Sequence, residues 1–137
     1  MPSPRLVAIL LAGLLAVERV AAAAEIDFEK RVRPLLVERC GDCHGPDTQE
    51  SGLRLDVKHR AFKGGDFGPV IVAGKADDSE VVRRIRSTDE KKRMPPDGPR
   101  LSNAEIDLLT RWIDAGADWP ATEVDRVAMK TDRDPRL

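Results

Sequence analysis

Both cysteines of this chain lie in one short stretch, Cys40-Gly41-Asp42-Cys43-His44, together with one of its two histidines. The pattern C-x-x-C-H is the attachment signature of a c-type haem. Thiols two residues apart can bond to the two vinyl groups of haem, and the next residue, His44, can give the iron its proximal imidazole ligand. The stretch therefore predicts one haem c, attached through Cys40 and Cys43, and a chain that folds around it.

Three other interpretations of the cysteines are open from the residues alone. A structural zinc site needs four ligands, and beyond Cys40, Cys43 and His44 the chain offers only His59 and carboxylates. A thioredoxin-like dithiol needs a βαβ setting, and the sequence has no convincing strand pattern. A Cys40–Cys43 disulfide would close a very small loop and would therefore stabilise the fold little. All three fit the chain less well than haem.

The first 24 residues have the pattern of a secretory signal peptide. A short basic start at Arg5 precedes an almost wholly apolar run from Leu6 to Val17, and the alanines at 21–24 end in an A-x-A-like cleavage site. A membrane span needs about 20 apolar residues, and Glu18 and Arg19 interrupt this run. We expect cleavage after Ala24, export to the periplasm and no membrane span in the mature chain, with an uncleaved anchor as the alternative.

Loss of residues 1–24 removes two arginines and one glutamate and changes the net charge from −1 to −2. A nucleic-acid-binding protein would carry a basic excess, so no nucleic-acid partner is expected. The chain is also poor in aromatic residues, with three Phe, two Trp and no Tyr. A mature domain with so few large apolar side chains would be stabilised by a large apolar cofactor at its centre.

Apolar spacing predicts an all-α fold of three main helices. Residues 26–39 carry an apolar stripe that includes Phe28 and Val32, with Asp27 as N-cap and Pro34 as a kink or break on the polar side. A second helix follows the acidic start at 77–80 and runs to Arg86. The last helix begins at a Ser102/Glu105 capping box, and Gly116 is its expected C-cap. The predicted domain spans 25–120, and the charged tail at 121–137 is expected to be disordered.

The chain between residues 45 and 69 is punctuated by glycine and proline and has no clear periodicity apart from a short helical turn near 57–62. So long an irregular stretch in a small domain usually wraps around something. Its apolar side chains are candidates to line a haem pocket: Leu53, Leu55, Phe62, Phe67, Val70 and Ile71.

The distal ligand of the iron has three candidates, Met94, Met129 and His59, because electron carriers pair the proximal histidine with methionine or a second histidine. Met94 lies in a charged loop stiffened by Pro95 and Pro96, which suits the presentation of a weak thioether ligand. Met129 falls in the presumed tail, and His59 fits a solvated surface histidine. Met94 is therefore the predicted distal ligand.

A proximal imidazole usually donates its second N–H to a carbonyl, and Pro69 is a possible acceptor for His44. Phe28 and Trp112 fit an ordinary helix–helix contact, although Trp112 near the haem edge is the alternative. Four cations are possible partners of the haem propionates, although each also fits a solvated surface position: Arg54, Lys63, Arg86 and Arg93.

The sequence resembles a class I, monohaem cytochrome c, and more narrowly the planctomycete-type cytochrome c domain. The similar blocks follow one another between Phe28 and Pro120: Val32 to Leu36, Cys40 to Gly45, Gly52 to Asp56, Lys63 to Pro69, Arg93 to Pro96 and Leu109 to Trp119. The resemblance implies a small cytochrome c-like helical domain around one covalent haem, with His44 proximal and Met94 distal. In that family the domain is often the N-terminal part of a longer exported protein.

The expected function is transfer of single electrons between redox partner proteins by an exported carrier that has no catalytic residues of its own. A haem-binding sensor or accessory domain with a displaceable distal ligand is the alternative from another class. A zinc-type structural module is the third. Haem staining separates the last from the first two, and carbon monoxide binding separates those from each other.

Overall fold

The computed structural model describes residues 25–133, which form five α-helices and no β-strand. In chain order the helical elements are a π-helix η1 (Phe28–Val32), α1 (Arg33–Cys40), a 3-10 turn η2 (Glu50–Gly52), α2 (Lys58–Lys63), α3 (Glu80–Arg86), α4 (Asn103–Asp114) and α5 (Glu123–Arg133). The all-α prediction is confirmed for this part of the chain. None of its helices has the length and apolar character needed to span a bilayer. The predicted signal peptide, residues 1–24, lies outside the described residues.

The first predicted helix is divided into a π-helix and an α-helix. Asp27 caps its start, as predicted, by accepting a hydrogen bond from the Lys30 backbone N–H at 3.0 Å. At the junction the Arg33 N–H donates to the Phe28 carbonyl, five residues back. Pro34 stands in the first turn of α1, where its missing N–H breaks no further bond. The proline therefore splits the helix, and it is exposed as expected.

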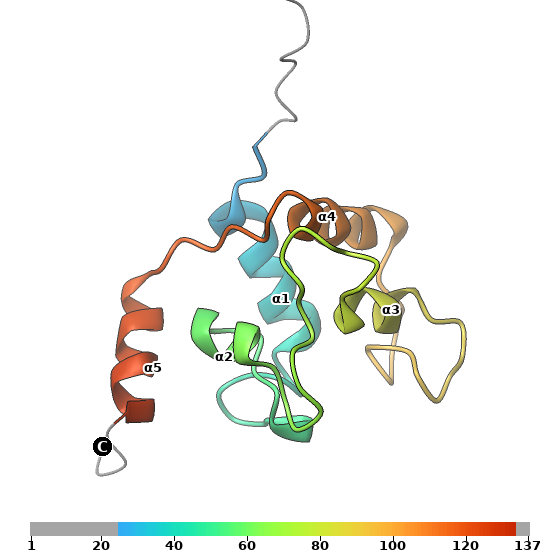
Figure 1. The fold of residues 1–137 in the computed structure, drawn as a ribbon. Coiled ribbons are helices and arrows are strands. Elements are labelled where there is room, and N and C mark those ends of the chain that lie inside the picture. The colour runs from blue at the N-terminus through green and yellow to red at the C-terminus, as the bar shows by residue number, and fades with distance from the viewer. Residues whose placement is uncertain (1–24, 134–137) are drawn as a thin grey trace, which may run out of the picture.

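The core forms where η1 and α1 meet α4, which lies across the upper end of α1 in Figure 1. The ring centroid of Phe28 lies 5.5 Å from that of Trp112 and 4.5 Å from that of Trp119. All three rings are buried, and the Trp112 Nε1–H donates to the Asp118 carbonyl at 2.8 Å. The predicted contact between Phe28 and Trp112 is confirmed. This aromatic cluster fixes the angle at which α1 delivers Cys40.

The helix α4 begins as its sequence predicts, but its C-cap is Ala115 rather than the expected Gly116. The Glu105 N–H donates to the Ser102 hydroxyl at 3.2 Å, while the Glu105 carboxylate accepts from the Ser102 N–H at 2.6 Å. Ala115 is the last capping residue, and Gly116 follows it with a φ of +110°, a left-handed conformation that favours glycine. The buried face of the helix carries Leu108, Leu109, Trp112 and Ile113.

The prediction of a disordered tail is wrong for residues 123–133, which form α5. Asp125 anchors this helix, because its buried carboxylate accepts hydrogen bonds from the backbone N–H groups of Lys58, at 2.7 Å, and Thr122, at 2.8 Å. Arg33 donates to the same carboxylate at 3.1 Å. A buried polar anchor leaves no apolar periodicity in the sequence, so the polar composition of the segment was misleading. Residues 134–137 lie outside the described part.

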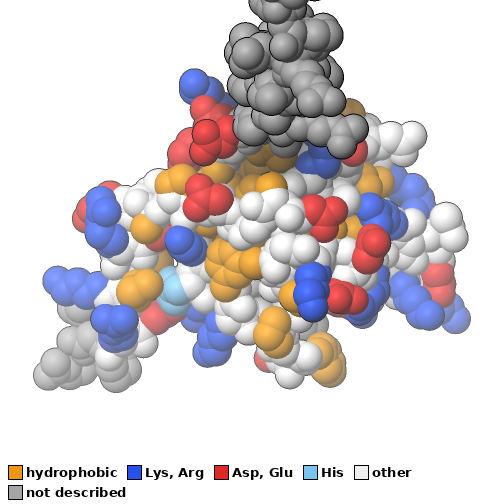
Figure 2. Space-filling model, turned by 45° about the horizontal axis from the view of Figure 1, so that its top comes forward, with side chains coloured by type: hydrophobic (Ala, Val, Ile, Leu, Met, Phe, Trp, Pro, Cys, Tyr) orange, Lys and Arg blue, Asp and Glu red, His pale blue; other side chains and the backbone are white. Residues whose placement is uncertain are grey.

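Charged side chains of both signs are interspersed over the face shown in Figure 2, with hydrophobic side chains exposed between them. Several acidic and basic groups of the described residues pair locally within one helix or loop. Such a surface has no single dominant sign, so local unpaired charges decide what it attracts.

Candidate haem site

The two thiols are delivered by the end of α1 and the turn that follows it. The Cys40 carbonyl accepts hydrogen bonds from the backbone N–H groups of Cys43, at 3.3 Å, and His44, at 2.9 Å. This tight turn brings Cys40, Cys43 and His44 to the wall of one cavity. A Cβ atom at Gly45 would lie 2.2 Å from the Gly41 carbonyl oxygen, so the turn can be followed only by glycine.

Both cysteines are free thiols rather than a disulfide. Burial raises the pKa of the Cys40 thiol to about 11, although the positive charge of Arg39 acts in the opposite direction. The thiol form of Cys40 is therefore favoured at neutral pH, whereas a nucleophilic thiolate needs a lowered pKa. No group of three or more His, Cys, Asp or Glu side chains within residues 25–133 is arranged to hold a metal ion by itself.

The backbone of His44 is fixed while its imidazole faces the cavity. Its carbonyl accepts a hydrogen bond from the Leu55 N–H at 2.8 Å. The ring atom Nδ1 is buried and has no hydrogen-bond partner among the described residues. Pro69 lines the same cavity, but its carbonyl does not accept from Nδ1 in this structure, so its supporting role stays a prediction. A buried ring nitrogen without a partner fits a residue that serves a bound group.

Met94 lines this cavity from a loop that side-chain hydrogen bonds hold in shape. Its backbone N–H donates to the Arg84 carbonyl of α3 at 3.1 Å. The neighbouring Arg93 side chain, only 13% exposed, donates to the carbonyl of Pro95 at 2.9 Å and to that of Gly98 at 3.3 Å. The rigid presentation of Met94 expected from the prolines is therefore reinforced by an arginine.

The cavity has a volume of about 620 Å³, within the range of about 300–1,000 Å³ typical of cofactor sites. Its apolar wall includes Leu53, Leu55, Phe67 and Val70, as predicted, and also Val81, Ile85 and Leu101. Two other candidates for this wall, Phe62 and Ile71, do not line it. They pack in the core instead. Apolar walls, two thiols and an imidazole form a donor set that fits a covalent haem.

The competing ligand candidates lie away from the cavity. His59 Nε2 is 2.6 Å from the Asp132 carboxylate of α5, and Met129 is exposed on the same helix. Trp112 belongs to the aromatic core. These positions leave Met94 as the methionine that shares a cavity with His44.

The four cations suggested as propionate partners do not line the cavity either. Arg54 pairs with Asp56, Arg86 with Asp77 and Arg93 with Glu90. The cations that do line it are Arg39, Arg83 and Arg84, which sequence reasoning missed. Arg39 could have been found from its position beside Cys40, whereas the two α3 residues carry no such signal.

The loop at 64–69 depends on the glycine that ends α2. Gly64 has a φ of +84°, and a Cβ atom there would lie 2.1 Å from the Gly68 carbonyl oxygen. We expect Gly64→Ala to lower the free energy of unfolding by about 2–3 kcal/mol, because strain and a backbone clash add. Gly74→Ala is the matched control, with a φ of +80° and nothing within 4 Å, and should cost about 1 kcal/mol. Urea titrations that gave equal losses would disprove the close approach.

Comparison with known families agrees with this geometry. Residues 40–98 match the family model described as Planctomycete cytochrome C. The matched stretch contains Cys40, Cys43, His44, Pro69 and Met94. The match supports a planctomycete-type cytochrome c domain in this part of the chain, and the family's description points to haem binding. Comparison of the chain with curated proteins and with solved structures gives no match.

Proposed function

We propose that this protein is an exported monohaem cytochrome c that carries single electrons between redox partner proteins. One observation carries the proposal: a single apolar cavity is lined by both thiols, by the His44 imidazole and by the Met94 thioether. The haem would be attached through Cys40 and Cys43, with His44 as proximal and Met94 as distal ligand. The family points to an electron carrier rather than an enzyme.

A bound haem would supply an iron that gains or loses one electron while its ligands stay in place. The residues that line the cavity have three different roles. Cys40 and Cys43 would tether the group, His44 and Met94 would ligate its iron, and the apolar wall would exclude water. Ligation by both His44 and Met94 would leave a substrate no free site on the iron, which would favour electron transfer over catalysis.

Covalent attachment is tested by haem staining of a denaturing gel, because only a covalent haem stays on the unfolded chain. We expect the wild-type band to stain and the double variant Cys40→Ala/Cys43→Ala to lose the stain completely. His44→Ala should keep the covalent haem and lose the low-spin spectrum, while the matched control His59→Ala should retain both. A wild-type band without stain would overturn the proposal.

Export is tested on the same protein. We expect N-terminal sequencing of the haem-stained band from a periplasmic fraction to begin at Glu25, since the cleavage pattern ends at Ala24. A stained protein that starts at Met1 and stays in the membrane fraction would show an uncleaved anchor instead.

A further inference from the structure

The rim of the cavity carries negative charge that the fold does not neutralise. Four of the residues that line the cavity are exposed carboxylates, here called the rim carboxylates: Asp42, Asp66, Asp78 and Asp97. None of them has an ion-pair partner within the described part of the chain. They come from four separate segments of the chain, so the charge does not belong to a single acidic loop.

The cations at the rim are already paired. Arg83 and Arg84 both contact the Glu80 carboxylate, at 3.4 and 2.6 Å. Arg39 lies 3.6 Å from the Glu105 carboxylate and donates to the Pro99 carbonyl at 2.9 Å. Among the charged residues that line the cavity, those without an ion-pair partner in residues 25–133 are therefore all negative.

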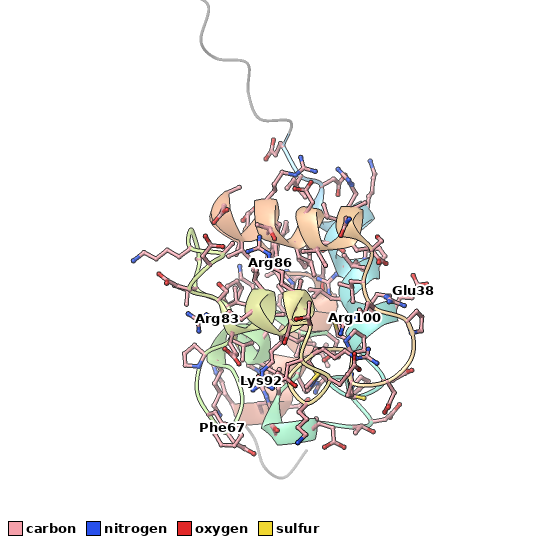
Figure 3. All side chains as sticks on the ribbon, turned by 90° about the vertical axis from the view of Figure 1, so that its right-hand side faces the viewer. Glu38, Phe67, Arg83, Arg86, Lys92 and Arg100 are labelled. Atoms are coloured by element: carbon pink, nitrogen blue, oxygen red, sulfur yellow. The ribbon has the colours of Figure 1, made fainter. Side chains whose placement is uncertain are left out.

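An exposed aromatic ring stands beside these carboxylates. Phe67 lies on the short loop between Gly65 and Gly68 and is 95% exposed, whereas Phe28 is 3% exposed. In Figure 3 it extends at the end of its loop, away from the labelled cations of α3. A phenylalanine so exposed at the mouth of a cavity is a feature of binding surfaces, where aromatic residues are enriched.

The cations labelled in Figure 3 suggest a different docking surface, one of positive charge that would attract an acidic partner. Each of them, however, has a carboxylate partner of its own. Arg86 lies 2.8 Å from Asp77, and Arg100 lies 2.8 Å from Glu90. Lys92 lies 3.8 Å from Asp89. This basic face is locally neutralised, so its long-range attraction is weaker than that of the rim.

We propose that the rim of the cavity is the docking surface of a redox partner with a positively charged face, and that Phe67 makes the central apolar contact. The inference rests on the proposed electron-transfer function, because electrons would pass at the opening of the cavity. Complementary charge raises the rate of encounter, and a single apolar contact keeps the complex short-lived. A carrier that must release one partner to meet the next needs such a weak complex.

The charge of the surface is tested with two trivalent oxidants of opposite sign, tris(1,10-phenanthroline)cobalt(III) and hexacyanoferrate(III). In either reaction one electron leaves the ferrous protein, giving ferric protein with cobalt(II) or hexacyanoferrate(II), and no bond forms or breaks. Stopped-flow rates are compared at about 10 mM and about 1 M salt, where the Debye length is roughly 30 and 3 Å. We expect added salt to slow the cobalt reaction about tenfold and to accelerate the hexacyanoferrate reaction.

The triple variant Asp66→Asn/Asp78→Asn/Asp97→Asn should remove most of this salt dependence. Asp42 is left intact because it lies between the two cysteines. The control Asp107→Asn/Asp118→Asn/Glu123→Gln removes the same charge from exposed positions that do not line the cavity, and it should behave as the wild type does. A hexacyanoferrate reaction that is the one slowed by salt would overturn the proposal in favour of the basic face.

Phe67 is tested at high salt, where charge is screened. Phe67→Ala should slow the reaction with the aromatic cobalt complex about threefold and leave hexacyanoferrate unchanged, since burial of a phenylalanine ring contributes free energy only with an apolar partner. Val37→Ala, at another exposed apolar position, is the control. Equal rates for Phe67→Ala and wild type would remove Phe67 from the surface.

A binding experiment separates this inference from the proposed function. Hexaamminechromium(III) is a paramagnetic, redox-inert cation, so it should broaden the amide signals of Asp66, Asp78 and Asp97 in NMR spectra of the ferrous protein before others. Broadening elsewhere would overturn the docking surface while haem staining stayed positive. A protein without haem stain would defeat the proposed function, whatever the chromium complex did.

Discussion

Replacing Met94 with alanine should remove the red-end sulfur-to-iron charge-transfer band of the oxidised protein and open the iron to external ligands. The expectation follows from the cavity, in which Met94 is the methionine that accompanies His44. Once the thioether is gone, carbon monoxide should bind the ferrous protein rapidly. The reduction potential should fall as well, because a thioether ligand favours the ferrous state. Absorption spectra, carbon monoxide kinetics and potentiometric titration measure the three effects.

Met129→Ala is the matched control for this experiment. Met129 is an exposed methionine of α5 and does not line the cavity, so its loss should leave spectrum, potential and carbon monoxide binding unchanged. A Met94→Ala protein that kept its charge-transfer band would show that the distal assignment is wrong. Rapid carbon monoxide binding by the wild type would instead favour a haem sensor with a displaceable ligand.

The motif residues and Met94, which line the cavity, were predictable because each follows from a local rule. The motif at Cys40 to His44 names its own chemistry, and Met94 stands out beside two prolines. The capping box of α4 can be read from two residues, and the structure has both of its hydrogen bonds. Such local patterns predict the folded structure well because the interactions behind them join residues that are close in sequence.

Long-range polar contacts could not be predicted in the same way. Arg33 donates hydrogen bonds to the Asp125 carboxylate, 92 residues away in sequence, and to the Asp56 carbonyl. No periodic pattern in the sequence predicts either hydrogen bond. The cations beside the cavity were missed for the same reason, since Arg83 and Arg84 reach it only through the orientation of α3. The π-helix at the start of α1 depends on one proline within a helical pattern, which predicts a break but not its form.

Asp125→Asn should be the most destabilising change outside the cavity, lowering the free energy of unfolding by about 3 kcal/mol. The side chain is 3% exposed and accepts hydrogen bonds from Lys58, Thr122 and Arg33. An amide cannot accept all of them, so backbone N–H groups would be left buried without partners. Denaturant titration measures the loss, and limited proteolysis should show α5 cut first.

The same carboxylate makes stability depend on pH. Burial alone would raise the pKa of Asp125, but hydrogen bonds from Lys58, Thr122 and Arg33 outweigh it and lower the pKa from 3.8 to about 2. A depressed pKa stabilises the fold fully above the ordinary value, and this contribution is lost as pH falls from about 4 to about 2. Each pKa unit corresponds to about 1.4 kcal/mol, so the loss is about 2 kcal/mol.

Comparison of Asp125→Asn with wild type isolates this carboxylate from the other acids that titrate in the same range. The two proteins should differ by about 3 kcal/mol at pH 7 and by about 1 kcal/mol near pH 2, where the wild-type carboxylate, with a pKa of about 2, is half protonated. Asp132→Asn is the control on the same helix. Its ion pairs with His59 and Arg60 are half-exposed, so it should cost less than about 1 kcal/mol. If the difference in free energy of unfolding between wild type and Asp125→Asn stayed constant with pH, the charge of Asp125 would not be what holds α5 against Arg33.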